Sequence, residues 1–166
     1  MLWIQVMLLV GCVSPSSGVL VGDGPPAPSD PSGPDDDDDD DDPVLYVNEL
    51  MADNETVLGD AQGLVADWLE LYNPGTEDFS LDGCSVSDDW TEPDQHVFAG
   101  DLVVPAYGHL LLWASDSPES GQDHLAFRLS ADGESVGIFD PDGRVIDWVS
   151  YPSQVPDQAR GRAWDG

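Results

Sequence analysis

The feature that most constrains the fold is a series of short apolar segments, separated by turn sequences, that begins at Val44. The segments are rich in β-branched and aromatic residues, and none has the period of an amphipathic helix. They cover Val44–Met51, Asp67–Asn73, Ser85–Ser87, His96–Phe98, Leu110–Ala114, Ala126–Leu129, Val136–Asp140 and Val145–Tyr151. This pattern predicts an all-β sandwich. The sequence Pro-Asp-Gly at 141–143 predicts a hairpin between the last two segments.

The segment Asp67–Asn73 places carboxylates among large apolar side chains. Leu69 and Leu71 alternate with Trp68, Glu70 and Tyr72, so a strand here has one aliphatic face and one mixed face. A carboxylate in such surroundings is costly unless it is paired, hydrogen bonded or bound to a metal. We therefore expect a functional site to lie near this strand.

The first residues have the features of an export signal. Met1–Val10 is apolar apart from Gln5, and about ten residues are half of what a bilayer crossing requires. Residues 9–12, Leu-Val-Gly-Cys, are similar to a bacterial lipobox. We predict a lipoprotein-type signal peptide over 1–11 and lipidation of Cys12, so that the protein is exported and anchored to a bacterial envelope, at the outer membrane or cell surface. The alternative is a plain signal peptide cleaved near Ser17, which gives a secreted protein.

Residues 12–43 predict a disordered linker. They are rich in Pro, Gly, Ser and Asp and end in an unbroken aspartate run over 35–42, which cannot bury enough apolar surface to offset its ordering entropy. The whole chain has 34 acidic residues and four arginines, for a net charge of −30. This charge disfavours binding to nucleic acid or to anionic lipid. We expect a monomer that contacts the membrane only through its lipidated N-terminus.

Several segments in one order resemble a known family. They are Val47–Asn54, Asp67–Asn73, Leu81–Gly83, Ser87–Asp89, Gly108–Trp113, His124–Ser130, Asp132–Glu134, Asp142–Asp147, Gln154, Gly161 and Arg162. In this order they resemble the lamin tail domain, an immunoglobulin-like β-sandwich of nuclear lamins and exported bacterial proteins. The resemblance implies this fold for residues 44–166. The role of nuclear lamins does not follow from it, because fold alone does not carry function.

Oxygen-bearing side chains around the first three segments suggest a cation site. The candidate ligands are Asn48, Glu49, Asn54, Asp67, Glu70 and Asp88, with Asp89 beside the last. Calcium prefers six to eight such oxygens, whereas zinc and copper prefer histidine and thiolate. The alternative is that these groups satisfy turn backbones or pair with arginine. The sequence leaves both interpretations open, and we predict no cofactor beyond this calcium ion.

The sequence predicts no catalytic residues. It contains no nucleophile elbow, HExxH motif, Walker loop or dinucleotide fingerprint. Glu49 and Glu70 form a glycosidase-like pair only if the fold separates them suitably. Cys84 is expected to be a small buried residue.

Trp90, in the polar loop 88–96, is expected to contact a ligand, because an exposed tryptophan among acids is unusual. These features predict a noncatalytic binding or structural module at the cell surface or in the periplasm, with an envelope protein or glycan as its partner. Two alternatives are an accessory domain of an exported hydrolase and a small metal-dependent hydrolase.

Overall fold

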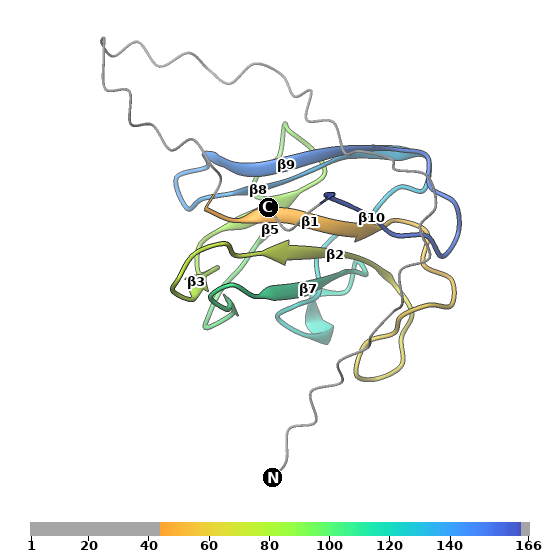
Figure 1. The fold of residues 1–166 in the computed structure, drawn as a ribbon, viewed down its shortest axis with the longest axis horizontal. Coiled ribbons are helices and arrows are strands. Elements are labelled where there is room, and N and C mark those ends of the chain that lie inside the picture. Colours follow the sequence, from red (N-terminus) through yellow and green to blue (C-terminus); the bar gives the residue numbers. More distant parts are fainter. Residues whose placement is uncertain (1–43, 164–166) are drawn as a thin grey trace.

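Two four-stranded antiparallel sheets form the part of the chain that the computed structural model describes, residues 44–163. The first has the order β10-β1-β2-β7 and the second the order β5-β4-β8-β9, while β3 and β6 form a separate pair (Figure 1). The strands are β1 (Tyr46–Met51), β2 (Asp67–Tyr72), β3 (Phe79–Ser80), β4 (Ser85–Ser87), β5 (His96–Val97), β6 (Val103–Val104), β7 (His109–Ala114), β8 (Gly133–Phe139), β9 (Val145–Pro152) and β10 (Arg160–Gly161). The predicted signal peptide and linker lie outside the described residues.

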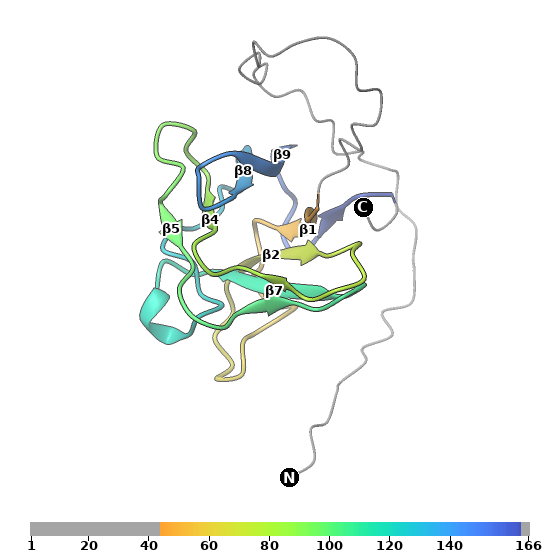
Figure 2. The ribbon, with the colours of Figure 1, turned by 90° about the vertical axis from the view of Figure 1, so that its left-hand side faces the viewer.

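The two sheets face each other across one hydrophobic core (Figure 2). Each sheet contributes the side chains of alternate positions, as a pleated strand requires. The first sheet supplies Leu50, Leu69, Leu71 and Leu112, and the second supplies Val86, Val136, Ile138 and Val149. Burying one such side chain stabilises the fold by about 1.5–3 kcal/mol. The all-β sandwich predicted from the sequence is confirmed.

Strand β2 has the two faces that its sequence predicts. Leu69 and Leu71 are fully buried in the core. On the opposite face, Trp68 packs with Met51 of β1 and Trp113 of β7 in a second, smaller cluster. The sheet is therefore covered on both faces at this end.

The strand predicted over 126–129 is wrong. Leu125, Phe127 and Leu129 are buried, but no strand contains them. Their backbone makes isolated bonds instead, such as the one from the N–H of Asp116 to the carbonyl of Phe127 (3.1 Å). Alternating burial therefore produced a strand-like pattern without a ladder.

Other parts of the prediction need smaller changes. Strands β3, β6 and β10 were not predicted, because two residues are too few to show a period of two. The hairpin is confirmed: Gly143 has φ +79°, and the N–H of Asp140 donates to the carbonyl of Arg144 (2.8 Å). Within residues 44–163, no helix is long and apolar enough to span a bilayer.

A buried carboxylate joins the two sheets at one edge. The N–H of Val47 in β1 donates to Oδ2 of Asp147 in β9 (2.8 Å). Nη2 of Arg162 donates to both oxygens of the same carboxylate, at 2.9 and 2.7 Å. Burial raises the pKa of the Asp147 carboxyl, while Arg162 and the Val47 N–H oppose that rise. The chain after β9 is thereby tied to β1.

Candidate functional site

Three of the predicted calcium ligands lie together on the outer face of the first sheet. A β-bulge at Asn48 places Glu49 opposite Glu70 of β2. Nδ2 of Asn48 donates to Oε1 of Glu70 (3.0 Å), and Nε2 of His109 lies 3.9 Å from the same oxygen. Two protein side chains therefore lie near one oxygen of the Glu70 carboxylate.

Asn54, in the loop that joins β1 to β2, and Asp67, the first residue of β2, form a second group. The Asn54 amide donates to the carbonyls of Leu58 and Ala66, both at 2.7 Å. Its oxygen accepts the N–H groups of Val57 and Leu58 at 3.1 and 3.3 Å. The side chain of Asn54 thus closes the loop, and a cation would compete with these bonds.

Asp88 lies in a third place, after β4 in the second sheet. Its N–H donates to Oε1 of Gln95 (3.1 Å), and Oδ1 of Asp89 accepts the N–H of Thr91 (2.8 Å). In the described part of the chain, no three histidine, cysteine or acidic side chains are grouped so as to hold a metal. The calcium site stays a prediction, and its six residues are divided among three places.

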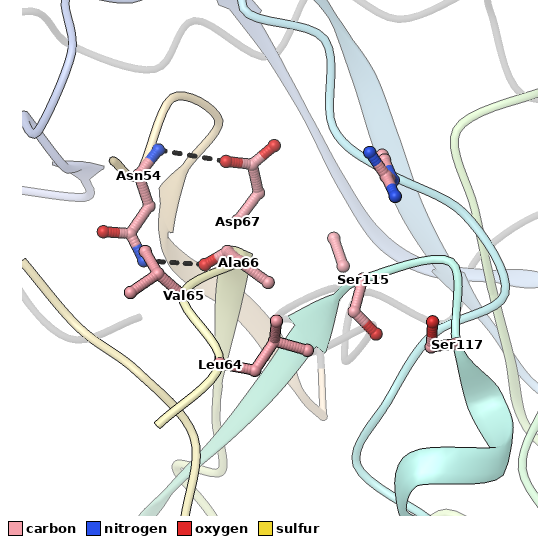
Figure 3. A pocket seen from close by; sticks show the side chains of 9 residues that line it. Asn54, Leu64, Val65, Ala66, Asp67, Ser115 and Ser117 are labelled. Atoms are coloured by element: carbon pink, nitrogen blue, oxygen red, sulfur yellow. Dashed lines mark hydrogen bonds between the residues drawn. The ribbon is translucent and has the colours of Figure 1, made fainter. Parts of the chain in front are cut away.

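A pocket with a volume of about 320 Å³ opens beside the second group (Figure 3). Two predicted residues, Asn54 and Asp67, line it. Figure 3 shows the N–H of Asn54 directed at the carboxylate of Asp67, and the side-chain amide of Asn54 directed at the carbonyl of Ala66. The other lining residues come from the β1–β2 loop, the end of β7 and the segment after it. They are Leu64, Val65, Ala66, Ala114, Ser115, Ser117 and Arg128. The pocket therefore combines a carboxylate, a guanidinium, hydroxyls and an apolar wall.

Behind the pocket lies a row of three polar side chains, Ser115, His124 and Asp60, that no sequence motif predicts. Oγ of Ser115 is 2.9 Å from Nδ1 of His124, and Nε2 of His124 is 3.7 Å from Oδ2 of Asp60. These are the residue types of a hydrolase triad, but Ser115 and His124 are only 7% and 2% exposed. The other oxygen of Asp60 accepts the N–H groups of Gln62 and Leu64, both at 2.8 Å. The row therefore fastens the β1–β2 loop to the end of β7.

Trp90 lies on the outer face of the second sheet. Its ring packs edge-to-face on Trp148 and Phe139, with centroid distances of 4.9 and 5.6 Å. The side chain is 37% exposed. The loop that carries it is held by Ser85, whose Oγ donates to the carbonyl of Pro93 (2.8 Å). Trp90 is thus a partly exposed aromatic group on an ordered loop.

Cys84 is buried in the core, as predicted, and makes no disulfide within residues 44–163. Burial raises the pKa of its thiol, which disfavours the thiolate. This residue therefore belongs to the core and not to a reactive site.

Two antiparallel sheets packed face to face over one core define an immunoglobulin-like β-sandwich. The family model of the Lamin Tail Domain matches residues 41–153, more than half of the chain. The chain belongs to the lamin tail domain family, and the resemblance stated from the sequence is confirmed. A comparison with curated proteins gave no match. The lamin tail domain is a noncatalytic module, consistent with a structural or binding role.

Two half-buried carboxyls near the loops have raised pKa values. Burial is the main cause of the rise in the pKa of Asp67 and of Glu134. Oε1 of Glu134 accepts hydrogen bonds from Tyr151 (2.6 Å) and from the N–H of Ser130 (2.7 Å), which oppose the rise without cancelling it. Both groups therefore bind protons more tightly in the folded chain than in the unfolded chain.

We predict that the free energy of unfolding increases as the pH is lowered from 7 towards the ordinary carboxyl values of 3.8 and 4.5. A raised folded pKa contributes stability that is complete below the unfolded value and is lost as the pH rises through the folded value. Urea unfolding at several pH values in this range measures the slope of the unfolding free energy against pH. The double variant Asp67→Asn/Glu134→Gln is expected to have a smaller slope than the natural chain.

The matched control is Asp101→Asn/Glu119→Gln, which changes the net charge equally at exposed positions. Its slope should stay close to that of the natural chain. Equal slopes for the two double variants would contradict a contribution of Asp67 and Glu134 to this pH dependence.

Proposed function

We propose that this chain is an exported, lipid-anchored protein that displays a noncatalytic binding module on an acidic linker. The lipobox-like residues before Cys12 and the aspartate run at 35–42 support this arrangement. Two or more acyl chains on one cysteine hold a protein on a membrane, where a single chain is marginal. Like charges along the linker extend it and keep the module away from the bilayer.

The observation that carries the binding role is the placement of Trp90. An aromatic side chain that is rigidly held and partly exposed offers contact area at a low cost in conformational entropy. Ser87 supports the same loop, because its Oγ lies 2.9 Å from Oε1 of Gln95. Trp148 and Phe139 support the ring from below. The surface is therefore formed before any ligand arrives.

The charge of the chain disfavours an anionic ligand at this surface. Acids outnumber basic residues by 34 to four in the whole chain, so an anionic polymer is repelled. Serine hydroxyls lie near the aromatic group on the same sheet, where Oγ of Ser135 and Oγ of Ser150 are 2.7 Å apart. An aromatic face with neighbouring hydroxyls fits the apolar face and hydroxyl edge of a neutral envelope glycan, and an envelope protein is the second candidate.

Substitution of Trp90 tests the binding surface. We expect Trp90→Ala to weaken binding of the full-length protein to an array of bacterial envelope glycans by about tenfold or more, in the range of an aromatic hot spot. Trp90→Phe is expected to retain part of the binding. Val155→Ala, at another exposed apolar residue, should bind as the natural chain does.

Thermal unfolding of each variant separates lost binding from lost stability, because Trp90 also covers Trp148. Glycan binding that is unchanged in folded Trp90→Ala would contradict the surface. Binding that is detected only with envelope proteins would indicate that the ligand of this surface is a protein and not a glycan.

Substitution of Cys12 tests the anchor. We expect the natural chain, expressed in its bacterial host, to incorporate radiolabelled palmitate and to sediment with membranes. Cys12→Ser is expected to lose both properties, because the thiol that carries the lipid is absent. Label that persists in Cys12→Ser, or that never enters the natural chain, would contradict the lipid anchor.

A further inference from the structure

The pocket between the β1–β2 loop and the end of β7 contains two opposite charges with unused bonding capacity. Oδ1 of Asp67 accepts the N–H of Asn54 (3.0 Å), and Figure 3 shows the second oxygen turned away from Asn54. That oxygen has no hydrogen bond or ion pair with any residue between 44 and 163. The guanidinium of Arg128, also in the pocket lining, has none within the same range.

Arg128 is close enough to Asp67 to act on it electrostatically. Its positive charge opposes the rise in the pKa of Asp67 that burial causes. Nevertheless no side-chain nitrogen of Arg128 lies within 4.0 Å of a carboxylate oxygen of Asp67, so the two groups form no ion pair. The pocket therefore separates a negative and a positive group, and a ligand with both charges could bind between them.

The remaining lining gives the pocket an apolar side and a hydroxyl. Leu64 and Val65 are 48% and 40% exposed, which is high for aliphatic residues that lie side by side. The hydroxyl of Ser117 makes no hydrogen bond among the described residues. A volume of about 320 Å³ is at the lower end of the range for small-molecule sites. The space fits a small ligand with one short aliphatic group.

The apolar wall is held in position before any ligand binds. Asp60 accepts the N–H of Leu64 through one oxygen and faces His124 with the other. His124 in turn bonds to Ser115 in the pocket lining. A wall fixed in this way lowers the entropy that binding would otherwise cost.

The charges of the pocket discriminate among classes of ligand. An anion alone is repelled by the acidic chain, whose net charge is −30. A metal cation alone is disfavoured at Asp67 because the guanidinium of Arg128 acts on the same position. A zwitterion avoids both penalties, since it is neutral as a whole and satisfies each charge locally.

We propose that this pocket binds a small aliphatic zwitterion, an amino acid or a short peptide with both ends free. The ammonium group binds Oδ2 of Asp67, the carboxylate binds Arg128 and the Ser117 hydroxyl, and the side chain contacts Leu64 and Val65. This site uses none of the residues of the Trp90 surface and does not depend on it.

Titrations with four small probes test the site in the full-length protein. L-leucine and leucyl-leucine carry both charges, N-acetyl-leucine lacks the ammonium group, and leucinamide lacks the carboxylate. We expect calorimetry to show saturable binding of L-leucine, of leucyl-leucine or of both. The ratio of their two dissociation constants tells whether the site prefers an amino acid or a peptide. N-acetyl-leucine and leucinamide are each expected to bind more weakly by about tenfold or more, since each loses one charge-assisted contact.

Variants locate the site. Arg128→Gln is expected to weaken zwitterion binding by about tenfold or more and to keep the thermal midpoint, because Arg128 is exposed and makes no hydrogen bond or ion pair within residues 44–163. Arg144→Gln, at an arginine of the β8–β9 hairpin, should bind as the natural chain does. The proposal is overturned if neither zwitterion binds, if N-acetyl-leucine or leucinamide binds as tightly as the tighter-binding zwitterion, or if Arg128→Gln binds normally.

Discussion

The carboxylate of Asp147 is the group on which the arrangement of the two sheets depends. It is buried between strands of different sheets, and it accepts hydrogen bonds from the Val47 N–H and, on both of its oxygens, from Nη2 of Arg162. Arg162 also donates its backbone N–H to the carbonyl of Asn48 (2.9 Å). A buried charge is tolerated only where such partners are complete. This contact therefore fixes three features together: the edge of the sandwich, the bulge in β1 and the position of β10.

With the sheets held in this way, the loops at their ends can carry binding groups. The β1–β2 loop is closed by Asn54 and fastened by Asp60, so that it forms one wall of the pocket. The loop after β4 presents Trp90 on the opposite sheet. Each loop is ordered mainly by hydrogen bonds from polar side chains to backbone groups, which rigid loops require. A rigid scaffold with ordered loops is a common basis for recognition without catalysis.

The fold could be predicted from the sequence because its strongest signals are local. Alternation in β2, continuous apolar residues in β7 and the Pro-Asp-Gly hairpin each identify one element. The segment 126–129 misled the prediction, because burial of Phe127 and Leu129 gives the same alternation as a strand ladder.

The site was harder to predict because it depends on contacts distant in sequence. Asn54 and Asp67 were identified, but Ser115, His124 and Arg128 come from segments that no sequence spacing connects to them. The role of Arg162 could not be predicted for the same reason, since its carboxylate partner belongs to β9.

The most direct test of the central contact compares two arginine variants at pH 7. Arg162→Met keeps an apolar stem near the ring of Tyr46 but leaves the buried Asp147 without its cation. Arg144→Met removes an arginine whose side chain is 75% exposed and which pairs with Asp142. Urea unfolding should show a loss of about 3 kcal/mol for Arg162→Met and less than about 1 kcal/mol for Arg144→Met. Equal losses in the two variants would contradict the claim that the Asp147 contact holds the sandwich together.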